Sequence, residues 1–322
     1  MSIDVLAPGL LTTVQDAGRD GARALGVGLA GAVDGYSLAV ANRLVGNPTT
    51  AAALEITLSG PRLRFRRAAT IAICGADIDA RSDELTLPGW RPIHLRAKST
   101  LTLGACRRGA RAYLAIAGGI DVPRVMGSRS TDLRGAFGGH AGRALRAGDG
   151  LSVGARNAPH AGANALSIAP WWIDPEPDLA FADSIAVRVL PGRDATAPVD
   201  ALHAQEFVVA ASSDRQGLRL HGPPLHLADR RECISEPVVP GTVQLPPDGQ
   251  PIVLLADAQT VGGYPRIGHV IAADLPRLAQ RRSGQRLRFI PVDHVQATRA
   301  NAQQRARLAR IALAISARPF HG

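Results

Sequence analysis

Short apolar runs, broken by glycine and proline, make up most of this chain. Several of them alternate between apolar and polar positions, which is typical of β-strands because successive side chains point to opposite faces of a sheet. The sequence therefore predicts a mainly β protein. The predicted strands cover residues 54–65, 70–80, 91–97, 110–119, 184–192, 206–212, 217–227, 241–247, 251–257 and 285–291.

Two helices are expected to interrupt this pattern. The first is predicted after Asp34, a good N-cap, and is expected to end at Gly46, before Asn47-Pro48. Its apolar face comprises Leu38, Ala41 and Val45. The second is predicted in the arginine-rich segment 299–318 and is interpreted as a terminal helix docked on the protein surface, with a membrane or partner contact as the alternative. Its apolar face comprises Leu308, Ile311 and Ile315.

Three stretches of the first half have similar counterparts in the second half, in the same order. The pairs are 58–65 with 220–227, 111–119 with 251–263, and 146–153 with 282–289. These internal repeats predict two related β modules. The halves are separated by a proline- and alanine-rich segment without a clean period. The predicted division is an N-terminal β module (1–155), a connection (156–183), a C-terminal β-barrel (184–291) and a C-terminal helix (292–322).

The composition is that of a globular protein. The 322 residues are 46% hydrophobic and 20% charged, which is enough apolar material for a full core. The formal net charge is +10, but the arginines are scattered, Lys98 is the only lysine, and aromatic residues make up only 4%. The aromatic stacking platforms of single-strand binders are therefore missing, and we expect no nucleic-acid partner.

The cysteines and the hydropathy of the chain indicate the cellular compartment of the protein. Cys74, Cys106 and Cys233 are isolated, which predicts neither a zinc site nor a disulfide framework and suits a reducing cytoplasm. The N-terminal sequence lacks the features of a signal peptide, and no apolar run reaches the ~18 residues that span a bilayer. We therefore expect a cytoplasmic protein that does not cross a membrane.

The common catalytic motifs do not occur. The sequence has no P-loop, no H-E-x-x-H zinc motif and no G-x-S-x-G elbow, and its histidines do not cluster. No metal site is therefore predicted, and the chain matches no common nucleotide or hydrolase template.

Four polar, glycine-rich clusters are the candidates for chemistry. In the first, Asp34 and Asn42 surround the start of the predicted helix, and capping is the simplest interpretation of Asp34. In the second, Ser128 and Arg129 lie in a segment that combines backbone N–H groups, hydroxyls and a guanidinium. This combination suits a carboxylate or phosphate, and a hydrogen-bonded turn is the alternative.

The other two clusters lie in the second half. The third contains Gln244 and Glu236, a carboxylate beside a strand that is suited to act as a general base. The fourth follows the strand 251–257, and its Gly262-Gly263 pair allows a backbone to approach a ligand closely. Its amide, hydroxyl and phenol groups belong to Gln259, Thr260 and Tyr264. These groups indicate a site for a small polar amide or acid and name no reaction.

Long, ordered motifs in this sequence resemble those of one family. They are G-A-V-D with A-N-R-L-V-G-N-P, then Y-L-A-I-A-G-G-I-D-V-P with M-G-S-R-S-T, then S-E-P-V with P-G-T-V-Q-L-P-P-D-G-Q-P and Q-T-V-G-G-Y-P. The resemblance is to the biotin-dependent carboxyltransferase family, also called allophanate hydrolase subunit 2-like, and it covers nearly the whole chain. One departure is Pro237, where glycine is expected, and it weakens the case for Glu236 as a catalytic residue.

The resemblance implies more than the composition can. It implies paired β-barrel modules of the cyclophilin-like type with a few short helices. The implied activity is that of the C subunit of an ATP-dependent 5-oxoprolinase, which acts with the A and B subunits to open 5-oxo-L-proline to L-glutamate. ATP would serve the complex, whether or not it binds this chain. The isolated chain is expected to be inactive.

Two alternatives stay open. One is a carboxyltransferase that moves a carboxyl group from carboxybiotin to urea or a related amide. The other is a regulatory partner of a kinase-inhibitor-like B subunit. Biotin is expected only in the first alternative, and it would arrive on another protein because Lys98 lacks the flanking methionines of a biotinyl acceptor.

Together with the resemblance, the polar clusters give a hypothetical set of roles. Gln259 and Tyr264 would recognise the substrate amide, and Ser128 with Arg129 would hold its carboxylate or phosphate end. A proton would be relayed by an acidic side chain. The predicted catalytic residues are Asp34, Glu236 and Tyr264, and the predicted substrate-binding residues are Asn42, Ser128, Arg129, Gln244, Gln259, Thr260, Gly262 and Gly263.

Overall fold

The computed structural model describes residues 2–155, 165–175, 179, 181–194, 199–226 and 234–318. The chain divides into two compact units. Unit 1 comprises Met1–Arg19, Asp34–Leu179 and Leu308–Gly322, and unit 2 comprises Asp20–Val33 and Ala180–Arg307. Residues 20–33 thus group with the second half of the chain. The predicted division assigns them to the N-terminal module. Cys233 and residues 156–164 of the predicted connection lie outside the described residues.

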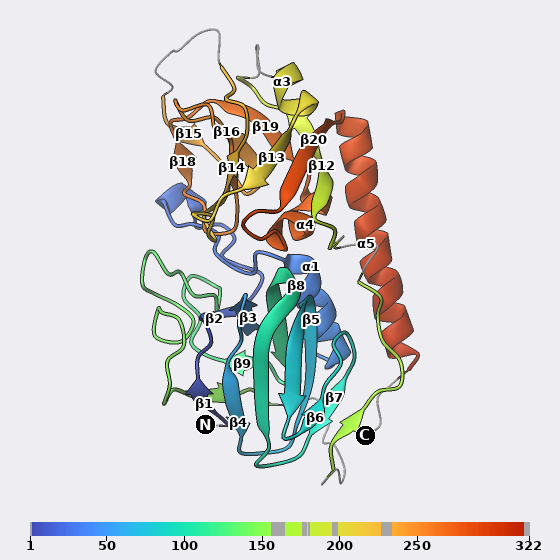
Figure 1. Cartoon of the computed structure of the whole chain (residues 1–322). Helices are drawn as coiled ribbons and strands as arrows, with labels where there is room; N and C mark the ends of the chain where they lie inside the picture. Colours follow the sequence, from blue (N-terminus) through green and yellow to red (C-terminus); the bar gives the residue numbers. More distant parts are fainter. Residues whose placement is uncertain are drawn as a thin grey trace. The chain divides into compact units, whose positions relative to one another are not determined.

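Unit 1 is built on an antiparallel sheet of 11 strands (Figure 1). The strands follow the order β11-β7-β5-β8-β4-β1-β10-β9, while β2 pairs with β3, β3 with β8, and β6 with β5. Their bounds are β1 Ile3–Ala7, β2 Leu11–Gln15, β3 Ala53–Thr57, β4 Arg62–Phe65, β5 Ala69–Ser82, β6 Leu85–Thr86, β7 Ile93–Leu95, β8 Thr100–Ile116, β9 Ile120–Asp121, β10 Gly150–Val153 and β11 Ser167–Ile168.

The two faces of this sheet differ in chemistry. One face carries the aliphatic core of the unit, with buried residues such as Leu54 and Leu114 opposite each other on β3 and β8. The other face carries Glu55, Tyr113 and Cys74, which form one cross-strand row on β3, β8 and β5. Period-2 alternation explains the difference, because neighbouring residues of a strand point to opposite faces.

The predicted first helix is α1 (Gly35–Leu44), which packs against β5 and β8. Asp34 caps it by accepting a hydrogen bond from the Ser37 N–H at 2.9 Å. After the helix, Gly46 has a φ of 75°, a left-handed conformation that favours glycine. The capping and stop signals in the sequence are therefore confirmed.

Unit 2 contains a closed barrel with the strand order β12-β19-β16-β17-β14-β13-β20 (Figure 1). The ring closes by parallel pairing of β12 with β20, and its other pairs are antiparallel. A separate ribbon consists of β15 and β18. The bounds are β12 Ser184–Pro191, β13 Glu206–Val209, β14 Gly217–His221, β15 Glu236–Pro237, β16 Thr242–Gln244, β17 Ile252–Leu254, β18 Val261–Gly262, β19 Arg266–Val270 and β20 Arg286–Pro291.

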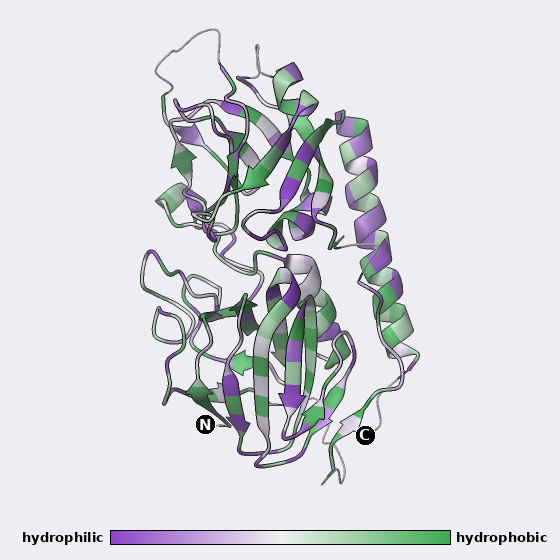
Figure 2. Cartoon of the chain, viewed as in Figure 1, coloured by the Kyte–Doolittle hydropathy of each residue, from purple (hydrophilic) through white to green (hydrophobic). Residues whose placement is uncertain are grey.

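Hydrophobic and hydrophilic residues alternate along the barrel strands (Figure 2). Leu218 and Leu220 of β14, Val243 of β16 and Val253 of β17 belong to the buried core of the unit. Inside the same core the rings of Phe207 and Phe289 meet edge to face at 5.8 Å. Residues between these core positions face outward and form the wall on which the candidate site lies.

Short helices complete the chain. Their bounds are η1 Arg23–Leu25, α3 Val199–Ala204, η2 Ala272–Asp274 and α4 Leu275–Ala279. The last helix, α5 (His294–Ser316), is the predicted terminal helix, and the division between the units falls within it. Ile311 of its predicted apolar face is 8% exposed.

The prediction of a mainly β protein with a few helices is confirmed, with 36% of the residues in strands and 17% in helices. The internal duplication stays a prediction. Strands β1, β2 and β19 were not predicted, and in β19 arginine, glycine and histidine mask the pattern in the sequence RIGHV. Gly268 is required there, since a Cβ would lie 2.6 Å from Cγ2 of Val189 on the paired strand β12.

A carboxylate in the turn before β10 makes the stability of unit 1 dependent on pH. Asp149 accepts hydrogen bonds from Arg143 Nη1 and Nη2, both at 2.8 Å, and from the Arg146 N–H at 2.7 Å. The Arg143 guanidinium holds the pKa of Asp149 well below its ordinary value. Because the folded-state pKa is depressed, this stabilisation is present above about pH 4 and is lost as the pH falls through the folded-state pKa.

We therefore expect Asp149→Asn to lower the free energy of unfolding by about 1–2 kcal/mol at pH 7. The difference from wild type should shrink below about pH 4, as seen in urea unfolding followed by tryptophan fluorescence. Asp83→Asn is the control, because the ion pair of Asp83 with Arg96 is 45% and 56% exposed and should contribute less than about 0.5 kcal/mol. An equal loss in both variants, unchanged by pH, would contradict the prediction.

Candidate functional site

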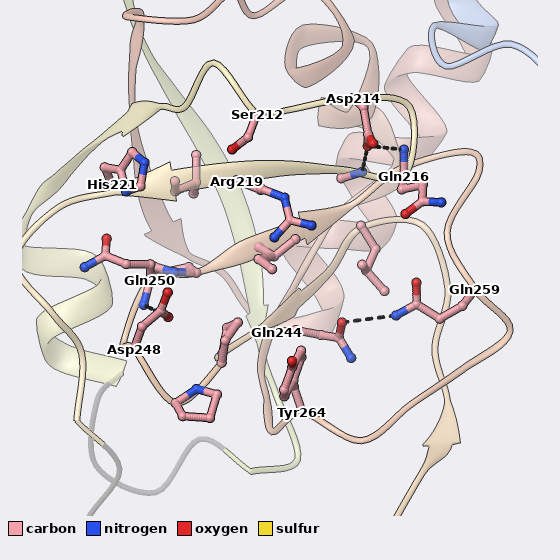
Figure 3. Close-up of a pocket in the computed structure, with 17 residues that line it drawn as sticks. Ser212, Asp214, Gln216, Arg219, His221, Gln244, Asp248, Gln250, Gln259 and Tyr264 are labelled. Atoms are coloured by element: carbon pink, nitrogen blue, oxygen red, sulfur yellow. Dashed lines mark hydrogen bonds between the residues drawn. The ribbon is translucent and has the colours of Figure 1, made fainter. Parts of the chain in front are cut away.

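A hollow of about 610 Å³ lies on the outer wall of the barrel in unit 2 (Figure 3). Outward-facing residues of β14, β16 and β17 form its floor. The turn between β16 and β17 and the segment that carries Gln259 and Tyr264 form its rim. Its volume is typical of small-molecule sites, which span about 300–1,000 Å³.

The floor places Arg219, Ile252 and Gln244 in one cross-strand row. Arg219 of β14 pairs with Ile252 of β17, and Ile252 pairs with Gln244 of β16. Directly opposed residues point to the same face of a sheet, so all three face the hollow. Since neighbouring strands lie about 4.8 Å apart, the backbones of Arg219 and Gln244 are separated by about 10 Å. The row has a cation at one end, an amide at the other and an aliphatic side chain between them.

Gln244 is the buried end of this row, with 1% of its surface exposed. Its Oε1 accepts a long hydrogen bond of 3.5 Å from Gln259 Nε2. Its Nε2 has no hydrogen-bond partner among the described residues. A buried N–H group left without a partner costs about 1–3 kcal/mol, so a ligand that accepts from it recovers this cost. Gln244 therefore lines the hollow and carries a buried donor on the side of Gly262.

Gly262 makes room for this amide. A Cβ at position 262 would lie 2.4 Å from Gln244 Nε2 and 3.4 Å from Gln259 Nε2. Any larger residue would push the amide of Gln244 out of place. The close backbone approach expected of the Gly262-Gly263 pair thus occurs toward Gln244.

Arg219 is the exposed end of the row. Its backbone is fixed by Ser213, whose Oγ accepts from the Arg219 N–H at 3.0 Å. Within the part of the chain that the structure describes, its guanidinium has no hydrogen bond or ion pair. The nearby carboxylates of Asp214 and Asp248 accept backbone N–H groups of their own turns. Arg219 therefore offers its charge to a ligand in the hollow.

A buried ion pair anchors the segment that carries Gln259. Arg215 Nε and Nη2 each donate to an Asp257 carboxylate oxygen at 2.8 Å, and the side chains are 5% and 10% exposed. Arg215 Nη2 also donates to the Gly31 carbonyl at 2.7 Å. This contact holds residues 20–33 on the barrel. The pair thus fixes the chain two residues before Gln259.

Glu236 lies on the ribbon beside Gly262 and is held by two arginines. Arg193 Nη1 donates to its carboxylate oxygens at 2.9 and 3.0 Å, and Arg266 Nη2 donates to Oε2. Two guanidinium groups make the carboxylate part of an ion-pair network that joins β15 to β19. Its predicted role as a proton relay stays a prediction.

Ser128 and Arg129 lie in unit 1, in a loop organised by Asp16. The Asp16 carboxylate accepts from Ser128 Oγ, Ser130 Oγ and the Arg129 N–H, each at 2.6 Å. The Arg129 guanidinium donates to the Val122 carbonyl at 2.9 Å and to an Asp121 carboxylate oxygen at 3.1 Å. The segment therefore forms a hydrogen-bonded turn. Its predicted part in holding an anion stays a prediction.

Asp34 also lies in unit 1, in a buried network. It accepts from Ser37 Oγ at 2.6 Å, and its N–H donates to Tyr113 Oη at 2.8 Å. Tyr113 in turn donates to Glu55 Oε2 at 2.6 Å. Burial raises the pKa of the Tyr113 phenol well above its ordinary value, and the carboxylates of Glu55 and Asp34 raise it further. The phenol therefore stays protonated and keeps its bond to Glu55.

Asn42 links the end of α1 to the loop that follows. Its Nδ2 donates to the Ala51 carbonyl at 2.8 Å, and its Oδ1 accepts from Asn47 Nδ2 at 3.0 Å. Asn47 also donates to the Ile116 carbonyl of β8 at 2.9 Å. These bonds give Asn42 a structural part in unit 1, and its predicted substrate contact stays a prediction.

The structure brings three predicted residues together at the hollow, namely Gln244, Gln259 and Tyr264. Gly262 lies behind Gln244, and Thr260 and Gly263 belong to the same segment. Arg219 was missed. The alternation in GLRLHG already placed it on the outward face of a strand, but only the register of β14, β17 and β16 shows that it shares a row with Gln244.

The described residues were also compared with the requirements of a metal site and of a membrane-spanning helix. Among the described residues, no group of three or more histidine, cysteine, aspartate or glutamate side chains is arranged to hold a metal ion. No described helix has the length and apolar character needed to cross a membrane.

The chain is a mainly β protein whose barrel wall carries a polar hollow. The family model for the carboxyltransferase domain, subdomain A and B, matches residues 25–291. The chain belongs to this family, and the resemblance read from its motifs is confirmed.

Known relatives share most of the chain. The C subunit of 5-oxoprolinase from Escherichia coli K12 is 40% identical over 94% of this chain and 95% of its own length. The protein of the same name from Haemophilus influenzae is 35% identical over 89% and 90%. The crystal structure of the Kluyveromyces lactis urea carboxylase matches with a TM-score of 0.85 and 30% identity, covering 96% of this chain but 29% of that protein's chain.

Proposed function

We propose that this chain is the C subunit of an ATP-dependent 5-oxoprolinase. With the A and B subunits it would open 5-oxo-L-proline to L-glutamate, with hydrolysis of ATP. The observation that carries the proposal is the match with two relatives of that name, which covers 89–94% of this chain and 90–95% of theirs. The urea carboxylase, by contrast, contains this fold as 29% of a longer chain.

The geometry of the hollow supports this function. A lactam has a carbonyl oxygen that accepts hydrogen bonds, and the unpartnered Nε2 of Gln244 is a donor held at the floor of the hollow. Donation to that oxygen withdraws electron density from the carbonyl carbon, which favours attack at the ring amide. The chain's part in the reaction would be to bind and orient the ring. ATP belongs to the complex, and we assign no ATP site to this chain.

Reconstitution of the complex tests the proposal. Release of L-glutamate from 5-oxo-L-proline and ATP would be measured with the chain alone, with the A and B subunits alone, and with all three. We expect product only from the complete mixture. Product from the A and B subunits alone, or none from an assembled three-component complex, would show that the proposal is wrong.

The likeness to urea carboxylase favours one second candidate, a carboxyltransferase that acts on urea or a related amide. The residues fit biotin as well, since its ureido ring has a carbonyl that Gln244 Nε2 would hold and an apolar face that Ile252 would contact. When bound, carboxybiotin would supply the carboxyl group. Avidin separates the two candidates, because it should leave a 5-oxoprolinase unaffected and abolish the turnover of a biotin-dependent enzyme.

A further inference from the structure

We propose that the hollow binds one small molecule at two points, a carboxylate at the Arg219 guanidinium and a carbonyl oxygen at Gln244 Nε2. The ligand class is a compact carboxylic acid that also carries an amide carbonyl. This inference deepens the proposed function and rests on it for the identity of the ligand as 5-oxo-L-proline. It assigns the carboxylate to Arg219, a residue that the sequence motifs do not point to.

The first point of contact is set by charge. In the described residues that line the hollow, Arg219 carries the only guanidinium, and it has no partner of its own there. Arginine binds carboxylates in a two-pronged geometry that adds both strength and orientation. Arg129, by contrast, already donates to a carbonyl and a carboxylate within its own loop. Arg219 is thus the better anion anchor.

The second point is set by burial. Gln244 is 1% exposed, and its Nε2 lacks a partner among the described residues. Its Oε1 accepts a long hydrogen bond from Gln259 at 3.5 Å, so the N–H group is left over for an acceptor. A neutral carbonyl oxygen suits this place better than a carboxylate, because a charge at a buried site without a cation is costly.

The row geometry joins the two points. Arg219 and Gln244 face the same side of the wall across Ile252, with backbones about 10 Å apart. Both side chains are long and line the same hollow, and the Gln244 amide is turned toward Gln259 (Figure 3). A five-membered ring can lie on Ile252 with its carboxylate toward Arg219 and its carbonyl toward Gln244. A ligand with only one of the two groups uses half of the site.

Calorimetric titration of the full chain tests the inference with three ring compounds. They are 5-oxo-L-proline, 2-pyrrolidinone, which lacks the carboxylate, and L-proline, which lacks the carbonyl. We expect each truncated compound to bind about 10- to 100-fold more weakly than 5-oxo-L-proline. Arg219→Gln should weaken 5-oxo-L-proline to a similar degree and leave 2-pyrrolidinone unchanged. Gln244→Met should weaken both lactams and leave L-proline unchanged.

Arg288→Gln is the matched control, since Arg288 is an exposed barrel arginine on β20 that does not line the hollow. Its affinities should equal those of wild type. Equal weakening of all ligands by Arg219→Gln, no difference between Arg219→Gln and Arg288→Gln, or no binding of 5-oxo-L-proline by wild type would overturn the inference. If Arg219→Gln fails to fold, Gln244→Met still tests the carbonyl half.

The reconstituted complex keeps this test separate from that of the proposed function. If the ligand pattern holds but the complete mixture yields no glutamate, the two-point site stands and the proposed function fails. If glutamate forms and Arg219→Gln leaves both turnover and binding unchanged, the function stands and the two-point site fails.

Discussion

Replacing Arg215 by methionine is expected to lower the free energy of unfolding of unit 2 by about 3–5 kcal/mol. The side chain is 5% exposed, and it donates to both oxygens of the nearly buried Asp257 and to the Gly31 carbonyl. Methionine fills a similar volume but leaves the Asp257 carboxylate buried without its cation. The loss of a charge partner, and not a cavity, is therefore the source of the large effect.

Hydrogen exchange of the barrel strands is the appropriate measurement. The tryptophans, Trp90, Trp171 and Trp172, belong to unit 1, so their fluorescence does not report on the barrel. Amides of β14 and β17 should exchange faster in the variant, and urea unfolding followed by circular dichroism should give the size of the loss.

Two further variants identify the cause of the loss. Arg219→Met, an exposed arginine of the adjacent strand, should change stability by less than about 0.5 kcal/mol. Adding Asp257→Leu to Arg215→Met should recover at least about 1 kcal/mol, because it removes the buried carboxylate that has lost Arg215. A change of less than about 1 kcal/mol in Arg215→Met itself would contradict this account of the ion pair.

The elements of this fold that sequence reasoning predicts are those whose signals are local. The Asp34 cap acts three residues away on Ser37, and Gly46 ends α1 within the same stretch. The strands follow from alternation within a few residues. Such signals need no knowledge of the rest of the chain.

The arrangement of the site depends on contacts between distant residues. Arg215 and Asp257 are 42 positions apart, and Ser128 contacts Asp16 over 112 positions. The sequence shows Ser128 and Arg129 as a promising anion site, but it does not show the carboxylate that occupies their donors. In the same way, Arg219 looks like an ordinary outward-facing strand residue until the strand register is known.

Residues of two predicted clusters lie together at the hollow. Gln244, Gln259 and Tyr264 come from segments that flank β17 and β18, so their proximity in the chain already brings them near one another. What the sequence does not predict is the direction of the Gln244 amide, which depends on the fit of Gly262 against it.

Because Gly262 lies against the Gln244 amide, we expect Gly262→Ala to lower kcat/KM of the reconstituted 5-oxoprolinase by at least about tenfold. The added Cβ would lie 2.4 Å from Gln244 Nε2, the far end of a flexible side chain, and the backbone φ at 262 is not left-handed. The amide can therefore swing aside at little cost to folding. The donor that we propose for the substrate carbonyl would be displaced, and a lost hydrogen bond of this kind costs about 1–3 kcal/mol.

Gly35→Ala provides the matched control for this change. A Cβ at Gly35 meets nothing within 4 Å, and the residue lies in the first turn of α1, where alanine is favourable. Both variants should melt within about 2 °C of wild type. Only Gly262→Ala should lose turnover and lactam binding together. If it keeps both, the Gln244 amide is not a ligand donor. If it loses turnover but keeps lactam binding, Gly262 acts elsewhere in the complex, for example where the ribbon meets another protein of the complex.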